Sequence, residues 1–125
     1  MARTPQDGIE FRNLEWTTSD KVWGGTDLDV EPIPVAILSW DAETGASTTL
    51  LRLPPGWHTP GPEFHSVVQE DILLEGDISF GGKKFTAPAY FCFPANYVHQ
   101  QARTENGALM MVTLSGPFDI TYPEA

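Results

Sequence analysis

The stretch LRLPPGWHTPGPEFHSVVQEDILLEG, residues 51–76, contains most of the residues from which the fold and the function are predicted. It starts as a short strand pattern, crosses a loop rich in proline and glycine, and enters a second strand pattern. Alternate side chains of an extended strand share a face. Glu63, His65 and Gln69 are therefore predicted to point to one side and Glu70 to the other, provided that no bulge intervenes.

A further histidine lies in PANYVH, residues 94–99, where a proline and an asparagine predict a turn. This turn would place His99 at the start of another strand. Residues of two strands can share one site if the sheet curls into a barrel, because closure brings distant strands together. We expect His99 to come within bonding reach of His65, with Glu63 and Gln69 aimed at the same point.

The rest of the chain predicts an all-β fold. Eleven glycines and eleven prolines interrupt almost every segment that is long enough for a helix. Between them lie short runs rich in β-branched and aromatic residues, and Gly81-Gly82 and Asn106-Gly107 are hairpin signals. We predict a small antiparallel β-barrel formed by one domain, residues 1–125. Its strands are expected at residues 9–16, 33–40, 48–53, 66–74, 77–80, 83–86, 90–93, 98–103, 109–114 and 118–122.

Charge and cysteine content exclude several classes of function. Seven basic against seventeen acidic residues give a net charge of −10, which disfavours binding to nucleic acid or to anionic membranes. The single cysteine, Cys92, excludes a disulfide within the chain; it lies in an apolar run and is expected to be buried. The start of the chain does not have the pattern of a signal peptide, and no apolar run suits a membrane helix. We therefore expect a cytoplasmic protein.

The spacing of these residues resembles the two sequence motifs of the cupin family. The first cupin motif has a glycine, a loop, H-x-H, three or four residues, a glutamate, six residues and a glycine. Gly56, Glu63, His65, Gln69 and Gly76 occupy these places. The PANYVH segment is similar to the second motif, in which a histidine follows a proline. The resemblance covers roughly residues 51–114 and looks closest to zinc anti-sigma cupin domains and acetylacetone-type dioxygenases.

Several positions depart from the usual motif. Glu63 stands where most cupins have a histidine, and Gln69 stands where most have a glutamate. The second motif lacks its P-x-G and carries Arg103 in place of a terminal asparagine. Two imidazoles and one carboxylate nevertheless form the set found in non-haem iron(II) oxygenases. The resemblance thus implies a divalent metal held by Glu63, His65, Gln69 and His99, with iron(II) expected first and zinc, manganese or nickel as alternatives.

Three functions are compatible with this set of residues. The first is a metal-dependent dioxygenase that cleaves a C–C bond beside a carbonyl of a small oxygenated molecule, with Glu63 and Tyr97 as catalytic candidates. The second is a domain that binds or senses a small molecule without turnover. The third is a metal-free isomerase or lyase with Glu63 as the base. The resemblance also implies a homodimer, to which residues 9–16 could contribute an added strand.

Overall fold

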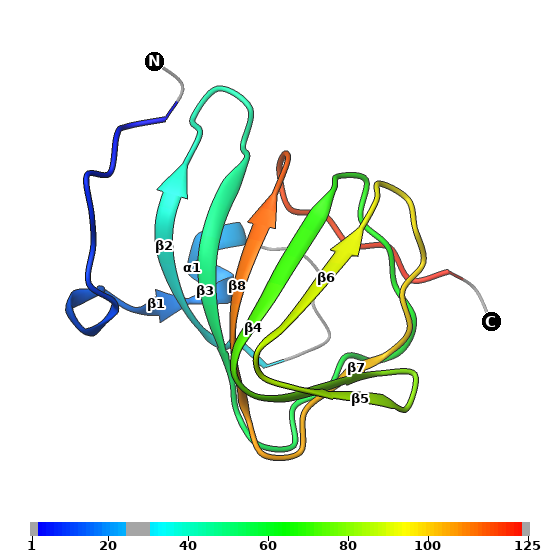
Figure 1. The fold of residues 1–125 in the computed structure, drawn as a ribbon. Coiled ribbons are helices and arrows are strands. Elements are labelled where there is room, and N and C mark those ends of the chain that lie inside the picture. Colours follow the sequence, from blue (N-terminus) through cyan, green and yellow to red (C-terminus); the bar gives the residue numbers. More distant parts are fainter. Residues whose placement is uncertain (1–2, 25–30, 124–125) are drawn as a thin grey trace.

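The computed structural model describes residues 3–24 and 31–123, which form an antiparallel β structure with two short helical segments (Figure 1). None of the helices in these residues is long and apolar enough to cross a membrane. The elements in chain order are η1 (Phe11–Asn13), β1 (Thr17–Thr18), α1 (Ser19–Trp23), β2 (Pro34–Trp40), β3 (Ser47–Leu53), β4 (Gln69–Phe80), β5 (Lys83–Thr86), β6 (Ala89–Phe93), β7 (Ala102–Arg103) and β8 (Ala108–Leu114).

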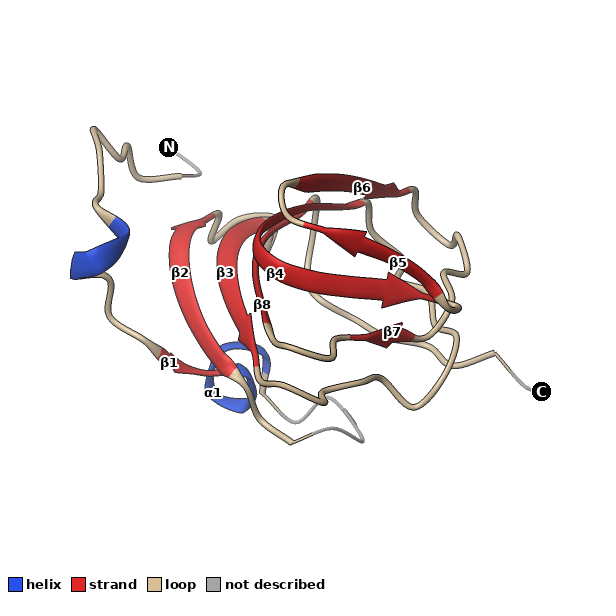
Figure 2. Ribbon diagram, turned by 60° about the horizontal axis from the view of Figure 1, so that its bottom comes forward, coloured by secondary structure: helices blue, strands red, loops and turns tan. Residues whose placement is uncertain are grey.

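The strands form one curled sheet in the order β1-β2-β3-β8-β4-β5, and β6 and β7 also pair with β4. Strand β4 is twelve residues long and serves two parts of the sheet. Its first half lies between β8 and β6, and its second half pairs with β5 and β7. Figure 2 shows β4 bending over the interior between these two groups of strands. The sheet is curled without closing into a complete ring of paired strands, and the predicted all-β antiparallel fold class is confirmed.

Alternation along the strands separates an inner from an outer face. On β4, Leu73 is fully buried, whereas on β6 Phe91 is buried and Phe93 is partly buried. These side chains belong to the main hydrophobic core, which fills the inside of the curl. The expectation that Cys92 is buried is wrong, because this residue is exposed. It lies between the two inward-facing phenylalanines of β6 and therefore points outward.

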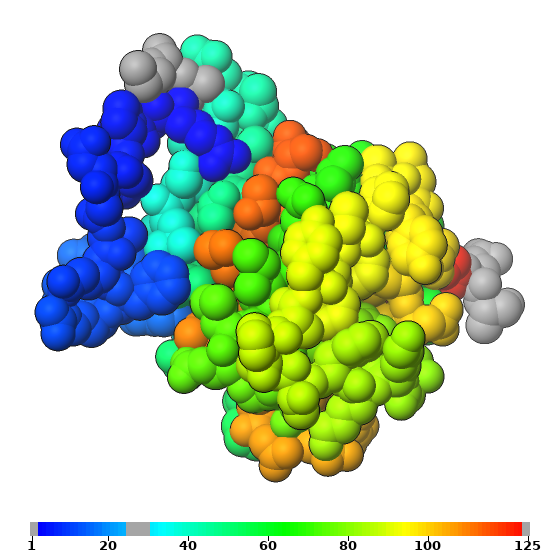
Figure 3. All heavy atoms as spheres, viewed as in Figure 1, coloured from blue at the N-terminus to red at the C-terminus, as the bar shows by residue number. Residues whose placement is uncertain are grey.

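Several predicted strands are shorter than expected or absent. Residues 9–16 contain the 3₁₀ turn η1 and no strand, and in Figure 3 this blue N-terminal segment stands off from the body over part of its length. An alternating pattern forms a strand only where it pairs with a neighbouring strand, and residues 9–16 form no ladder with the strands of the described residues. The strand predicted at 98–103 is limited to β7. In residues 118–122 only Thr121 forms a bridge, to Phe64.

Candidate metal centre

Backbone pairing brings the two motif segments together. The amide of Glu63 donates to the carbonyl of His99 at 3.0 Å, and the amide of His99 donates back to Glu63 at 2.9 Å. The amide of Asn96 also donates to the carbonyl of His65 at 2.7 Å. Asn96 has a φ of 66°, a backbone conformation that asparagine tolerates better than most residues. These contacts hold the 94–99 turn against the segment from Glu63 to His65.

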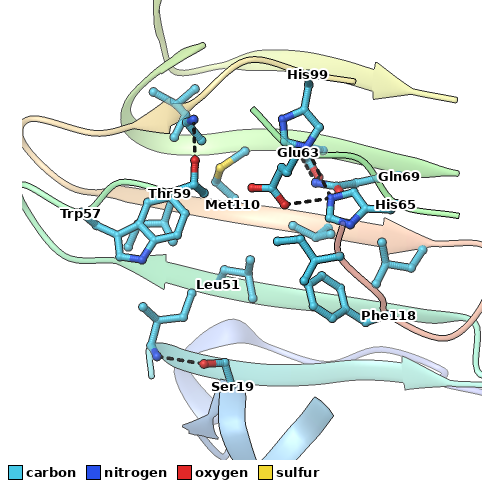
Figure 4. Close-up of a pocket in the computed structure, with 18 of the residues that line it drawn as sticks. Ser19, Leu51, Trp57, Thr59, Glu63, His65, Gln69, His99, Met110 and Phe118 are labelled. Carbon is cyan, nitrogen blue, oxygen red and sulfur yellow. Dashed lines mark hydrogen bonds and ion pairs between the residues drawn. The ribbon is translucent and has the colours of Figure 1, made fainter. Parts of the chain in front are cut away.

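The side chains of Glu63, His65 and His99 converge inside the curl, as Figure 4 shows. Their relative exposures are 4%, 5% and 5%. The Nε2 atoms of the two imidazoles are 3.3 Å apart, and Glu63 Oε2 lies 3.5 Å from His65 Nε2. All three ligand atoms lie within 4.8 Å of one another. The structure therefore brings together the carboxylate and the two histidines that the sequence singled out.

The hydrogen bonds of the two imidazoles determine which nitrogens face each other. Nδ1 of His65 lies 2.5 Å from the carbonyl oxygen of Asp119, and Nδ1 of His99 lies 3.2 Å from that of Gln100. A carbonyl oxygen only accepts, so each Nδ1 must carry the proton and each neutral ring presents an unprotonated Nε2. Two lone pairs then face each other at 3.3 Å. This is the outer-shell arrangement found around metal-bound histidines, and a cation between the rings would relieve the repulsion.

Burial favours the neutral form of every ionisable group of the cluster. It lowers the pKa of the His99 imidazole to about 4 and also lowers the pKa of His65. Burial, together with the nearby negative charge of Asp71, raises the pKa of the Glu63 carboxyl to about 7. Near neutral pH both imidazoles are therefore neutral, and each carries a single ring proton. Two neutral imidazoles and a carboxylate fit a divalent transition metal such as Fe²⁺ or Zn²⁺.

The cluster lies in the wall of a cavity of about 110 Å³. Most of the remaining lining is apolar and comes from the inner faces of β3, β4 and β8, from α1 and from residues 118–122. Aromatic rings fix the imidazoles: Phe93 stacks on His99 with centroids 4.5 Å apart, and Phe118 lies 5.4 Å from His65. The site is therefore a small, mostly apolar cavity with Glu63, His65 and His99 together at one end.

Gln69 also lines this cavity, as its place in the alternation predicted, although it is only partly buried. Residues 63–69 are not one continuous strand, because residues 66 and 67 form a bend before β4 begins. Whether Gln69 binds a metal stays a prediction. Asp71, which the sequence analysis did not single out, lies in the same cavity with 2% exposure. It shares the parity of Gln69 on β4, so the same alternation could have identified it.

Tyr97, the other catalytic candidate from the sequence, and His58, the third histidine, lie outside the cavity wall. Tyr97 is 54% exposed and stacks on Phe93 with centroids 6.1 Å apart. Its catalytic use stays a prediction. His58 is exposed, and its Nδ1 lies 2.9 Å from the carbonyl oxygen of Thr59. This loop histidine therefore lies at the surface, apart from the cluster.

A curled antiparallel sheet that holds two histidines and a carboxylate in its interior defines a protein of the cupin class. Within that class, the chain belongs to the family of ChrR cupin-like domains, whose family model matches residues 5–119. No curated protein matches the chain in sequence.

Solved structures share the fold at low sequence identity. A proposed dioxygenase from Nostoc punctiforme has a TM-score of 0.75 and 21% identity over 91% of this chain and 40% of its own. A proposed acetylacetone dioxygenase from Methylibium petroleiphilum has a TM-score of 0.71 and 18% identity over 97% of this chain and 83% of its own. A chain in the complex of Rhodobacter sphaeroides SigE with the anti-sigma ChrR has a TM-score of 0.60 and 16% identity over 85% and 52%. The present chain thus spans less than half of the Nostoc protein, and these likenesses concern the fold alone.

Proposed function

We propose that the protein is a metal-dependent enzyme of the dioxygenase type that cleaves a C–C bond beside a carbonyl group of a small organic molecule. The observation that carries this proposal is the pair of imidazole Nε2 atoms 3.3 Å apart beside the buried carboxylate of Glu63, with each Nδ1 against a backbone carbonyl. Two histidines and a carboxylate with open positions are typical of non-haem iron(II) oxygenases. The fold that the chain shares with dioxygenase structures is consistent with this reaction class.

The volume and the lining of the cavity suit a small substrate. Its volume of about 110 Å³ is below the roughly 150 Å³ of an engineered apolar cavity that holds benzene. The apolar lining suits carbon-bonded parts of a ligand, whereas the polar end suits oxygen atoms. A divalent cation with Glu63 as its one carboxylate ligand keeps a net positive charge within the ligand set, which favours coordination by an anionic oxygen such as that of an enolate. A small β-dicarbonyl compound has these properties.

The chain's own residues have distinct roles in this proposal. Glu63, His65 and His99 would hold the metal, and the carbonyls of Asp119 and Gln100 orient the two imidazoles. Iron(II) bound there would supply Lewis acidity toward the carbonyl and access to O₂ chemistry. The apolar lining excludes water from the reacting atoms, and Phe93 and Phe118 keep the imidazoles from turning. Cleavage of one C–C bond between the two carbonyl groups would give a carboxylic acid and a 1,2-dicarbonyl compound, with one atom of O₂ in each product.

The test is oxygen uptake by protein loaded with Fe²⁺ under anaerobic conditions and then mixed with acetylacetone in air-saturated buffer. We expect O₂ consumption to match loss of the enolate absorbance, and to stop on addition of a chelator. Substitution of His65 by glutamine should abolish the uptake, whereas the matched control His58→Gln, at an exposed loop position, should retain it. Stoichiometric iron without O₂ uptake on any small β-dicarbonyl would contradict the proposed reaction.

A second function, binding or sensing without turnover, is favoured by the family match and by the likeness to a chain in the SigE–ChrR complex. A pure binding domain would be stabilised by its ligand through mass action and would consume no substrate. Thermal denaturation with acetylacetone in the absence of O₂, compared with the uptake assay, separates the two functions. The homodimer that the resemblance implies stays a prediction, and light scattering is the measurement that checks it.

A further inference from the structure

Asp71 is a buried charged residue of the cavity that the proposed ligand set does not use. It lies on the inner face of β4, two residues after Gln69, with 2% exposure. Burial raises the pKa of its carboxyl to about 7. Charged residues are almost never fully buried without a partner, so Asp71 is expected to have a hydrogen-bond partner inside the protein.

That contact is the side-chain amide of Gln69. Its Nε2 donates to both carboxyl oxygens of Asp71, at 3.0 Å and 2.9 Å. Within the described residues, these are the hydrogen bonds that the Asp71 side chain makes. An amide has a donor end and an acceptor end, and here the donor end is committed to Asp71. The hydrogen bonds of the Gln69 side chain to the described residues are the two from its Nε2, so its carbonyl oxygen accepts none from them, and the side chain lines the cavity.

The pairing also accounts for an amide at position 69, where the cupin motif usually has a glutamate. A glutamate there would place a second carboxylate against Asp71 at hydrogen-bond distance, in a buried setting where like charges repel strongly. With glutamine, the negative charge lies two residues further along β4 and position 69 presents a neutral oxygen. The residue type at position 69 is thus coupled to the charge of Asp71.

We propose that Asp71 is a positioning residue of the metal centre: it fixes the Gln69 amide so that the carbonyl oxygen faces the cation as a neutral fourth ligand. This inference rests on the proposed metal site, although the pairing itself does not require a metal. If the amide were free to turn, its N–H₂ end would face a cation in part of the molecules, and that orientation cannot ligate.

The first experiment measures the pairing in metal-free protein. Thermal denaturation in EDTA at pH 8 is compared for the wild type, Gln69→Glu, Asp71→Asn and the double variant. We expect Gln69→Glu to lower the Tm by at least about 5 °C more when Asp71 is present than when Asn replaces it. Equal losses in the two backgrounds would overturn the pairing, whatever the protein's reaction.

The second experiment uses Co²⁺ as a spectroscopic probe of coordination. Gln69→Leu removes the oxygen and should change the intensity of the visible Co²⁺ bands, and Asp71→Asn should produce a change of the same kind with a several-fold weaker affinity. In the double variant Gln69→Leu/Asp71→Asn we expect no further change. Glu70→Gln, on the outer face of the same strand, is the control and should keep the wild-type spectrum.

The outcomes separate the possible failures. If Asp71→Asn keeps the wild-type spectrum while Gln69→Leu alters it, Asp71 does not position the amide. If neither variant alters it, the oxygen does not face the cation. If the wild type takes up no Co²⁺, the proposed metal site is wrong and the positioning role falls with it, while the metal-free comparison still reports on the pairing.

Discussion

Replacement of Glu63 by glutamine is expected to stabilise the metal-free protein while removing its ability to bind a metal. The carboxyl is 4% exposed, and burial raises its pKa from 4.5 to about 7. Because the folded state binds the proton more tightly than the unfolded state, ionisation of Glu63 destabilises the fold. This cost is absent below pH 4.5, where both states are protonated, and is fully present above pH 7.

The magnitude follows from the change in pKa. A rise from 4.5 to about 7, at 1.36 kcal/mol per pKa unit, corresponds to about 3 kcal/mol. For a domain of this size, that free energy shifts the Tm by about 10 °C. The glutamine side chain has nearly the same shape as glutamate, and its N–H₂ group can donate a hydrogen bond to the unprotonated Nε2 of His65. The substitution should therefore cost little packing. The variant should therefore be more stable than the wild type at pH 8 and nearly equal at pH 4.5.

The assay is thermal denaturation in EDTA at pH 4.5 and pH 8, followed by a titration with Zn²⁺ at pH 8. Zinc at about 100 times its Kd should stabilise the wild type by about 2.7 kcal/mol and should stabilise Glu63→Gln much less. Glu75→Gln, at an exposed position of β4, is the control and should change neither result. A Glu63→Gln variant that is no more stable than the wild type at pH 8, or that gains the same stability at both pH values, would show that the buried charge of Glu63 does not destabilise the fold.

Two other predictions concern the histidines and a glycine of the motif. His65→Gln and His99→Gln should each weaken Zn²⁺ binding at least about 100-fold in a chelator competition, whereas His58→Gln should leave it unchanged. If all three variants bind Zn²⁺ with equal affinity, His65 and His99 are not metal ligands. Gly76→Ala should cost more than about 3 kcal/mol in urea denaturation, because φ is +84° and a Cβ would lie 1.9 Å from a backbone oxygen. Gly82→Ala, with a φ of +87° and open space around it, should cost about 1 kcal/mol, and a similar loss in both variants would speak against the clash.

Alternation depends on local geometry alone, and it explains why Gln69 of β4 faces the cavity. Glu63 and His65 lie before the bend at residues 66 and 67, so their place in the cavity follows from backbone pairing with residues 94–99. Asp71 was not singled out, although its parity on β4 places it inside. Attention went to the residue types of the motif, and a carboxylate is ordinarily expected at the surface.

Other features depend on contacts between distant parts of the chain. Residues 9–16 have the alternation of a strand, but a strand also needs a partner edge, and alternation does not say where one is. The convergence of His99 with Glu63 depends on backbone pairing across 36 positions, which only the family motif could suggest. Which histidine nitrogen carries the proton depends on the carbonyls of Asp119 and Gln100, and no local pattern indicates that.

The metal centre can be tested most directly by anomalous diffraction from crystals of the protein grown with Co²⁺ or Fe²⁺. We predict one strong peak inside the curled sheet, about 2.0–2.2 Å from Nε2 of His65, Nε2 of His99 and a carboxylate oxygen of Glu63. An empty cavity at full metal saturation, or a peak bound elsewhere such as at His58, would contradict this prediction.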